Sequence, residues 1–497
     1  MRPVLVTDAQ DPYELLQPRL AAVVEDAPAG ERRLRLPLAH LDAAAGMLLE
    51  RRGRLVAMSR TEWPEPSLVV AIAFRGELVA LRAPLEDASS YQALSRFTPA
   101  ARLPERELRD LYGLEPLGHP APEPLLRSDA DRFDRRVIGA EAFTIPYGPI
   151  RSGVFESIQY VVETGGEDVL ALQVRPFFKH RGLERRFGGL PYEHAAQLAE
   201  RVAGIAAVAH ASAFAQSVER ALGVEPTRRA QRWRVVHAEL ERIANHLDVA
   251  IRLAEDAAVV VGAARFGILK EDVMRLRARL CGSRFGRGVV VPGGIAGPPL
   301  LAPAAVLRAL DRLEHDLRRD RRLLLKTTSF TDRLIGSGRL DRATVEAYAG
   351  VGPVARASGV GTDARFERPY GAYVQLGERL ATADAGDAMA RLQVRFDEID
   401  ESLHLIRQAF ERLDRYAPEL RAELPAGTGA AFGWVEAPMG ELVYWVEVAE
   451  GRVRLIRIAS PSLRNWPLFA ESFRGDVLTD FSFIEHSFGL TQAGADR

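Results

Sequence analysis

The pattern of apolar and polar positions changes once along the chain, from strand-like to helix-like. Residues 54–58 and 68–74 are short apolar or β-branched runs bounded by Gly and Pro, which is typical of strands. Residues 104–112 predict a helix, because Pro104 suits a first helical turn and Gly113 suits a helix end. The first part of the chain is therefore predicted to be an α+β domain.

The second part begins with a predicted hairpin and continues mainly as helices. The hairpin strands are residues 154–162 and 169–174, and the glycines between them permit a tight turn. Beyond it, residues 193–222 form a long alanine-rich helical segment whose small side chains would allow close approach of neighbouring elements. In residues 230–254 apolar side chains recur at three- and four-residue spacing, as in an amphipathic helix.

Two more helices and one β segment complete the predicted second part. The helices are residues 303–326 and 388–413, and residues 440–458 return to a strand pattern around Glu450 and Gly451. The predicted fold class is an α+β N-terminal domain followed by a mainly helical domain with small β elements.

A domain boundary is predicted where proline and charge replace the apolar pattern. Residues 116–124 are rich in proline and residues 128–136 are highly charged. We therefore expect a first domain over residues 1–127, a charged linker over 128–140, and a second domain over 141–497.

Composition excludes several classes of protein. The formal net charge is −1, so no global field attracts nucleic acid. Cys281 is the only cysteine, and one thiol cannot form an internal disulfide, a Cys₄ zinc site or an iron–sulfur site. The chain shows no signal-peptide pattern and no apolar run near the roughly 20 residues that span a bilayer. We expect a cytoplasmic location, with membrane association only through partners.

The first domain contains a motif with a family resemblance. Residues 105–113 read ERELRDLYG and are followed by His119 and Pro120. This run is similar to the signature of the complex I subunit lettered C. Residues 121–124 depart from the family pattern, which puts the local docking contacts of that subunit in question.

The second domain resembles the complex I subunit lettered D and the large subunit of membrane-bound nickel–iron hydrogenases. Its matching segments occur in the family's order over most of the domain. They include residues 180–184, 239–246, 292–294, 352–353, 358–359, Asp363, Arg365, 369–370, 436–438, 440–441 and 461–462. The resemblance implies the hydrogenase large-subunit fold.

The resemblance also implies that a metal site has been lost. Nickel in a hydrogenase requires soft thiolate ligands, and the family supplies them as two cysteine pairs. In this chain Ala203 and Ala206 stand at the first pair, and Thr491 and Gly494 stand at the second. We therefore expect that the chain holds no metal and is not an active hydrogenase.

In complex I the vacated space binds a quinone headgroup, and the residues implied for this role have changed here. A family loop supplies a histidine, but this sequence reads Gly148-Pro149 and then Ile150-Arg151. Arg201 aligns with the family's quinone-binding tyrosine, and Tyr147 lies nearby in the sequence. Arg151, Arg201 and Tyr147 are thus candidates for the quinone cavity.

Four further residues are implied to lie near the cavity or a partner's cluster. His180 and Arg181 open the best-matched motif, and a fixed positive charge there would tune the cluster's potential. His246 matches a cluster-proximal histidine, and His210 aligns with a residue close to the hydrogenase metal. Ordinary structural roles remain open for all four, and the acidic run 397–401 is interpreted as a solvated helix face.

The resemblance implies a peripheral-arm subunit of a complex I-like or hydrogenase-like membrane oxidoreductase. It would bind no cofactor itself and would pass electrons from a partner's iron–sulfur cluster to a quinone-type acceptor at the interface. Its expected partners are an iron–sulfur small subunit, a ferredoxin-like cluster subunit and antiporter-like membrane-arm subunits, on the cytoplasmic side of the cell membrane. The alternative is a non-catalytic scaffold or transducer in a formate hydrogenlyase-like complex that has lost its nickel–iron centre.

Overall fold

The computed structural model describes residues 14, 16–17, 20–126, 142–151, 157–377, 379–411, 413 and 416–497. It divides into two compact units, Met1–Leu125 and Leu126–Arg497. The predicted linker 128–140 and residues 154–156 of the predicted hairpin lie outside the described residues.

The first unit is built on a five-stranded sheet with the order β1-β2-β5-β4-β3. Strands β2 and β5 run parallel and the other neighbours are antiparallel. The elements are β1 (Val23–Glu25), β2 (Glu31–Arg35), α2 (Leu41–Leu49), β3 (Arg54–Thr61), β4 (Ser67–Phe74), β5 (Glu77–Pro84), β6 (Ser90–Gln92), α3 (Arg102–Tyr112) and β7 (Glu115–Leu117), with short 3₁₀ turns η1 (Leu38–His40), η2 (Leu94–Arg96) and η3 (Pro99–Ala101). Strand β4 is buried along its whole length, as its continuous apolar pattern requires.

Helix α3 explains the motif of the first unit. It ends at Gly113, whose left-handed φ of 69° terminates the helix. The buried Glu105 accepts hydrogen bonds from the main-chain N–H groups of Leu94 and Ser95, so it caps the start of η2. His119 bonds the carbonyl oxygen of Arg102 at 3.1 Å. These contacts lie inside the unit and give the motif a structural role.

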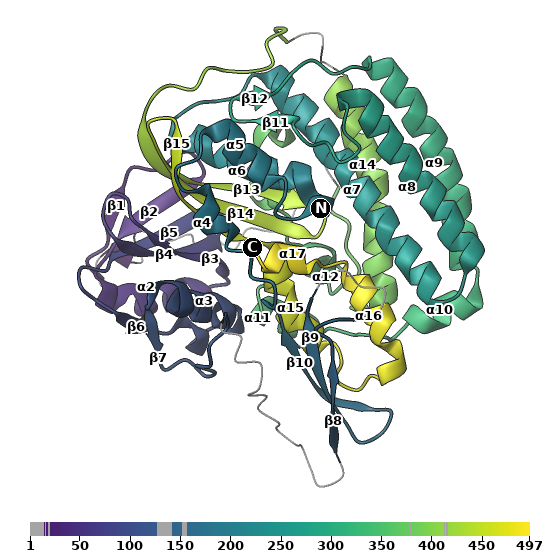
Figure 1. Ribbon diagram of the computed structural model, residues 1–497, viewed down its shortest axis with the longest axis horizontal. Helices are drawn as coiled ribbons and strands as arrows, with labels where there is room; N and C mark the ends of the chain where they lie inside the picture. Colours follow the sequence, from purple (N-terminus) through teal and green to yellow (C-terminus); the bar gives the residue numbers. More distant parts are fainter. Residues whose placement is uncertain are drawn as a thin grey trace. The chain divides into compact units, whose positions relative to one another are not determined.

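The second unit is mainly helical and holds three antiparallel sheets (Figure 1). Its strands are β8 (Phe143–Tyr147), β9 (Gln159–Thr164), β10 (Val169–Arg175), β11 (Val290–Val291), β12 (Gly294–Ile295), β13 (Thr428–Ala437), β14 (Gly440–Ala449) and β15 (Arg452–Ala459). Its helices are α4 (Leu183–Phe187), α5 (Tyr192–Ala199), α6 (Ala207–Ala221), α7 (Arg228–Asp256), α8 (Val260–Cys281), α9 (Pro303–Leu325), α10 (Thr328–Leu334), α11 (Arg342–Ala347), α12 (Gly352–Arg356), α13 (Ala364–Glu367), α14 (Ala388–Phe410), α15 (Pro461–Glu471), α16 (Phe481–Phe488) and α17 (Gln492–Ala495), with 3₁₀ turns η4 (Gly204–Ala206), η5 (Gly371–Gln375) and η7 (Leu478–Asp480). The predicted fold class is confirmed.

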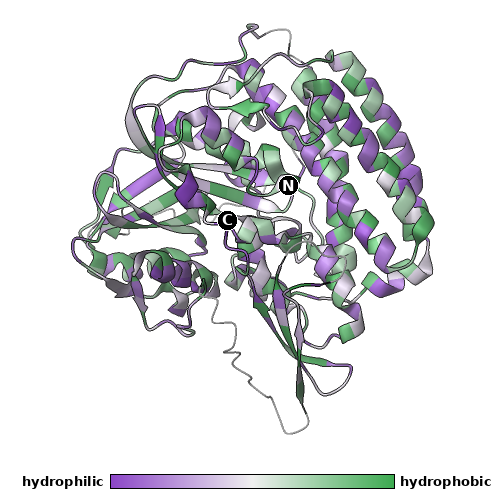
Figure 2. Cartoon of the chain, viewed as in Figure 1, coloured by the Kyte–Doolittle hydropathy of each residue, from purple (hydrophilic) through white to green (hydrophobic). Residues whose placement is uncertain are grey.

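The long helices α7, α8, α9 and α14 pack side by side and enclose the largest apolar core. Their hydropathy alternates along each ribbon, as amphipathic helices require (Figure 2). None of the described helices is both long enough and apolar enough to cross a membrane.

The alanine-rich segment 193–222 is not one helix, although its composition favours helix throughout. The chain leaves helical geometry after Ala199, and Ala203 is extended with φ −139° and ψ 112°. The main-chain N–H of Gly288 donates to the Glu200 carboxylate at 2.6 Å, which fixes the break from outside the segment. Local composition cannot reveal such a tertiary contact.

The small residues of α6 serve contact with a sheet. A side chain at Gly433 of β13 would collide with the main chain of Ala213 and with Ser217, so glycine allows the strand to lie directly against the helix. The predicted 440–458 segment forms β14 and β15, whereas β13 and helix α8 were not predicted. Helix α8 could have been found, because Phe266, Leu269, Val273, Leu276 and Leu280 recur at three- and four-residue spacing.

Candidate functional site

Two loops of the second unit hold the four positions where cysteine pairs are expected. Ala203 and Ala206 lie between α5 and α6, whereas Thr491 precedes α17 and Gly494 lies within it. The structure buries all four, with exposed fractions of 1% for Ala203, 0% for Ala206 and 5% for Thr491. Methyl, hydroxyl and hydrogen side chains supply no thiolate, so these residues do not fit a nickel–iron centre.

Arg181 joins these two loops. Its Nη2 donates to the carbonyl of Val202 at 2.7 Å and to the carbonyl of Ala493. Its Nη1 donates to the carbonyl of Arg201 and its Nε to that of Asp496, each at 3.3 Å. The guanidinium therefore forms hydrogen bonds to the main chain of its own unit. Its influence on a partner's cluster stays a prediction.

His210 and Tyr444 form a buried neutral pair beside this region. His210 lies in the first turn of α6, four residues after Ala206, which precedes the helix. The distance from its Nδ1 to the Tyr444 hydroxyl is 2.6 Å, and the ring is 1% exposed. Burial, together with the charges of Arg181 and Arg497, lowers the pKa of His210 to about 3. The ring is thus neutral and shares one hydrogen bond with the Tyr444 hydroxyl.

The last described residues are folded into the same region. Ala495, Asp496 and Arg497 are 0%, 2% and 4% exposed. The Asp496 carboxylate accepts the main-chain N–H of Phe177 at 2.7 Å, and Arg497 Nε donates to Glu184 at 2.8 Å. Burial alone would raise the pKa of Glu184, but its ionic partners, including Arg497, hold that pKa below its usual value. The HRGLE motif is thereby bound to the α17 segment.

Arg201 and His180 take different places around these loops. The Arg201 side chain is 54% exposed and donates to the carbonyl of Gln197, in the last part of α5. His180 sits in the turn after Phe177, whose carbonyl accepts its main-chain N–H at 3.3 Å. A role for either residue at a quinone or a cluster remains a prediction.

The Arg151 side chain is bound by a carboxylate of the same unit. Both terminal nitrogens donate to the carboxylate of Glu485, at 2.8 and 2.7 Å, and Tyr160 donates to the same carboxylate at 2.7 Å. Its guanidinium also stacks over Tyr147, 5.2 Å from the ring centroid. Tyr147 itself is 43% exposed and packs edge-on against Phe481. Sequence reasoning missed Glu485, which lies over 300 residues away from Arg151.

A second group of functional candidates lies on the inner face of α7. Glu239, Arg242 and His246 share this face, and Glu239 pairs with Arg242 at 3.0 Å, as their three-residue spacing on a helix favours. Glu239 also accepts hydrogen bonds from the hydroxyls of Tyr373 at 2.5 Å and Ser402 at 2.6 Å. These groups are the start of a larger ionic cluster.

His246 belongs to this cluster. Its Nε2 lies 2.8 Å from the carboxylate of Glu398 on α14. The ring is fully buried, and burial lowers its pKa to about 4 despite the attraction of Glu398. The ring is therefore neutral near pH 7, because the carboxylate only partly offsets the cost of burying a charged ring.

Arg356 of α12 is the hub of the cluster. It forms ion pairs with Glu398 at 2.6 Å, Glu436 at 2.9 Å and Asp363 at 3.3 Å. Arg365 connects these groups to Glu239 on α7, since it pairs with Asp363 at 2.8 Å and with Glu239 at 3.2 Å. We define the buried ionic cluster as Glu239, Arg242, His246, Arg356, Asp363, Arg365, Glu398 and Glu436. Each of its members is at most 3% exposed.

The acidic run 397–401 is divided between two environments. Asp397 and Asp400 are exposed, as predicted, but Glu398 and Glu401 are 2% and 6% exposed. The interpretation as a solvated face was wrong for these two, because charge composition hides the three-residue spacing that turns them inward.

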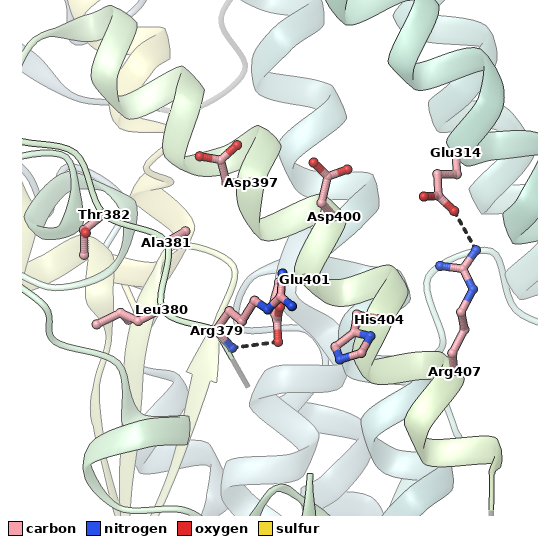
Figure 3. Close-up of a pocket in the computed structure, with 10 residues that line it drawn as sticks. All are labelled: Glu314, Arg379, Leu380, Ala381, Thr382, Asp397, Asp400, Glu401, His404 and Arg407. Atoms are coloured by element: carbon pink, nitrogen blue, oxygen red, sulfur yellow. Dashed lines mark hydrogen bonds and ion pairs between the residues drawn. The ribbon is translucent and has the colours of Figure 1, made fainter. Parts of the chain in front are cut away.

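The structure also contains an open acidic groove beside α14, with a volume of about 540 Å³ (Figure 3). Its carboxylates already have partners: Asp397 and Asp400 pair with Arg321, Glu314 pairs with Arg407, and Glu401 accepts the main-chain N–H of Arg379. Among the described residues, no group of three or more His, Cys, Asp or Glu side chains is arranged to hold a metal ion.

Family models match both units. The model described as the respiratory-chain NADH dehydrogenase 30 Kd subunit matches residues 35–135, and that of the 49 Kd subunit matches residues 266–427. The combination of the two in one chain agrees with the resemblance noted in the sequence.

Curated relatives fall into two groups. The D 2 subunit of NADH-quinone oxidoreductase from Salinispora tropica is 31% identical over 365 residues, covering 71% of this chain and 92% of the relative. Formate hydrogenlyase subunit 5 from Escherichia coli is 28% identical over 440 residues, covering 82% and 77%. The carbon monoxide-induced hydrogenase of Rhodospirillum rubrum is 29% identical over 356 residues, covering 69% and 96%.

Proposed function

Because the chain belongs to the family of the D subunits of NADH-quinone oxidoreductase, with a region of the 30 Kd subunit family before it, we propose that it is a peripheral-arm electron-transfer subunit. It helps pass electrons from a partner's iron–sulfur cluster to a quinone-type acceptor at their interface. The complex is a membrane oxidoreductase of the complex I or hydrogenase type. The chain itself binds no cofactor.

One observation carries this proposal: Arg181 holds the two former cysteine loops together through main-chain carbonyls. No thiolate stands at the four positions in these segments, so they offer none of the soft ligands that nickel needs. An oxidoreductase subunit without such ligands receives its electrons from a neighbouring cluster. The proposed partners are the iron–sulfur small subunit, a ferredoxin-like cluster subunit and antiporter-like subunits of the membrane arm.

The outer side of the first loop offers a surface for the iron–sulfur partner. Ile205 and Phe285 are each 41% exposed, although both are large and apolar. Arg287 stacks over Phe285 at 5.3 Å, and its guanidinium lies against Gly204. With the exposed Arg201, the surface combines apolar contact area and positive charge, which suits a partner with complementary acidic residues.

The test is to purify the intact complex and to assay quinone reduction with several electron donors. An Ile205→Asp variant should lose the iron–sulfur partner and the quinone reductase activity together. An Ile268→Asp variant is the control, because Ile268 is 60% exposed on α8 and lies outside this surface. Absence of quinone reduction by the intact complex with every donor would contradict the electron-transfer proposal.

A specific observation favours the alternative function of a scaffold or transducer. Arg151 is committed to Glu485, and an exposed arginine stands where the family's quinone-binding tyrosine is expected. If the complex assembles and moves ions without reducing a quinone, this alternative is correct. Stoichiometric nickel in the purified chain would contradict both functions.

A further inference from the structure

One nitrogen of Arg356, the hub of the buried ionic cluster, has more acceptors within reach than it has hydrogens. Nη1 of Arg356 carries two hydrogens. Three oxygens lie within reach of this nitrogen: the carbonyl of Thr362 at 2.7 Å, Glu436 Oε1 at 2.9 Å and Asp363 Oδ2 at 3.3 Å. One acidic oxygen is therefore left without a full hydrogen bond from this group.

Glu436 is the least compensated carboxylate of the cluster. Glu239 contacts two guanidiniums and two hydroxyls. Glu398 contacts Arg356, His246 and, at 3.6 Å, Arg242. Asp363 has Arg365 as well as a share of Arg356. Among the described residues, the Glu436 carboxylate has a single side-chain donor, Arg356, which it shares with two other carboxylates.

One further guanidinium contacts Glu436, but it reaches the main chain and not the carboxylate: Arg242 Nη2 donates to the Glu436 carbonyl at 2.7 Å. Glu436 Oε2 accepts the main-chain N–H of Ala364 at 3.0 Å, and the Glu436 N–H donates to the Tyr370 hydroxyl. The charged and titratable groups that face it are Arg242 on α7, Arg356 on α12, Asp363 and Arg365 at α13, Tyr370, and Glu441 opposite it on β14, which pairs with Arg368 and Arg464. Arg395 acts on Glu398, His246 and Arg356 through its charge, since its own hydrogen bonds go to main-chain carbonyls.

We propose that Glu436 is a buried proton-binding site, which takes up one proton while the other three carboxylates of the cluster stay ionised. Protonation neutralises Glu436, the carboxylate that shares its only side-chain donor. Three ionised carboxylates then face the three guanidiniums of the cluster. Burial and the neighbouring Asp363 raise the pKa of Glu436 to about 6, whereas Arg242 and Arg365 hold that of Glu239 at about 2 despite its burial. The two carboxylates therefore titrate in different ranges of pH.

A group that binds a proton just below neutral pH fits a subunit whose electron transfer must be balanced by protons. That connection rests on the proposed function. Proton binding by Glu436 does not, because it is a property of the resting protein. The two claims can therefore fail separately: a Glu436 that binds no proton would not contradict electron transfer to a quinone, and a complex that reduces no quinone would not contradict proton binding by Glu436.

The test is a pH titration of the full chain by infrared spectroscopy, which detects the C=O stretch of protonated carboxyls in H₂O and its shift in D₂O. Burial also raises the pKa values of Glu105 and Glu241 to about 7, so the wild-type band contains several components. The spectrum of wild type minus Glu436→Gln isolates one component, expected with a midpoint near pH 6. Glu219→Gln is the matched control, because Glu219 is buried and has its own guanidinium, Arg234.

A difference spectrum without such a component, or one equally lost in Glu219→Gln, overturns the proposal. If Glu436→Gln does not fold, Asp363→Asn provides the decision. Asparagine keeps the cap of α13 and removes the negative charge beside Glu436. The midpoint of the Glu436 component should then move to lower pH. If the titration of Asp363→Asn is the same as that of wild type, the proposal is also overturned.

Discussion

The two buried polar regions of the second unit compensate charge in different ways. Around the vacated metal positions, Arg181 is held by main-chain carbonyls, and the adjacent His210–Tyr444 pair is neutral. In the buried ionic cluster, guanidiniums face carboxylates directly. In the first region several carbonyl oxygens together stabilise one guanidinium. In the ionic cluster each charged group is stabilised by oppositely charged partners, so the loss of one partner leaves a charge uncompensated.

This difference predicts which substitutions are tolerated. Removing one partner from a buried ion pair leaves an uncompensated charge in a medium of low polarity. Removing a cation that donates to main-chain carbonyls leaves neutral acceptors without a partner. The loss of stability is then smaller. The ionic cluster should therefore be more sensitive to single substitutions than the loops around Arg181.

The largest effect is expected for Arg356→Met. The change leaves Glu398, Glu436 and Asp363 without their common partner. We expect a loss of about 3–5 kcal/mol in the free energy of unfolding, which is a large fraction of the stability of a domain. Chemical denaturation of the subunit within its complex measures this free energy. A loss below that of Arg181→Met would refute the contrast between the two regions.

Arg181→Met should cost less, about 2–3 kcal/mol, because several hydrogen bonds from a charged donor to main-chain carbonyls are lost. The loops at Val202 and Ala493 should become more accessible, which amide hydrogen exchange detects. Lysine keeps the charge but cannot reach several carbonyls in one plane, so Arg181→Lys should restore only part of the stability.

The same variant also tests the predicted electrostatic role of Arg181. If its charge acts on a partner's cluster, the redox potential measured by EPR in the assembled complex falls in Arg181→Met and returns largely in Arg181→Lys. A potential that stays constant in both variants leaves Arg181 with its structural role alone.

The sequence predicts the helices and strands well where one periodicity persists, as in α7 and α9, which begin and end within two residues of the expected bounds. It fails at the break after Ala199, because Glu200 is held by Gly288 from a distant segment. Charge composition likewise misjudges Glu398, since burial depends on which side of α14 faces α7.

The candidate site is only partly readable from the sequence. The family motif identifies Arg181, His210 and the vacated positions. It does not reveal that Glu485 binds Arg151 or that Tyr444 bonds His210, because these partners lie more than 200 residues apart in the chain. Pairing of this kind is set by the fold and leaves no local pattern.

The pH dependence of stability should reveal Glu436. Its folded-state pKa is about 6 against an ordinary value of 4.5, so the folded state binds the proton more tightly. The resulting stabilisation is fully present below about pH 4.5 and is lost as the pH rises through about 6, for a change of about 2 kcal/mol. The histidines His210 and His246 act in the opposite direction, because their pKa values are lowered.

The quantity to measure is therefore the stability of wild type minus that of Glu436→Gln, as a function of pH. The histidine contributions cancel in this difference, and glutamine represents the permanently neutral form. The difference should fall by about 2 kcal/mol between pH 4.5 and pH 7. A difference that is constant with pH would show that Glu436 binds no proton in this range.

The smallest effect is expected at the neutral pair. Tyr444→Phe removes the hydroxyl and leaves the buried Nδ1 of His210 without this hydrogen-bond partner, which should cost about 1–2 kcal/mol. His210→Phe removes the other partner, and the double variant should lose less than the sum of the two single losses. The coupling energy from this double-mutant cycle should be about 1 kcal/mol. Because His210 is neutral well above its pKa of about 3, the coupling should not change between pH 6 and pH 8. A coupling that grows toward pH 6 would mean that the ring becomes charged there, and the region around the vacated positions would then resemble the ionic cluster more closely than the structure indicates.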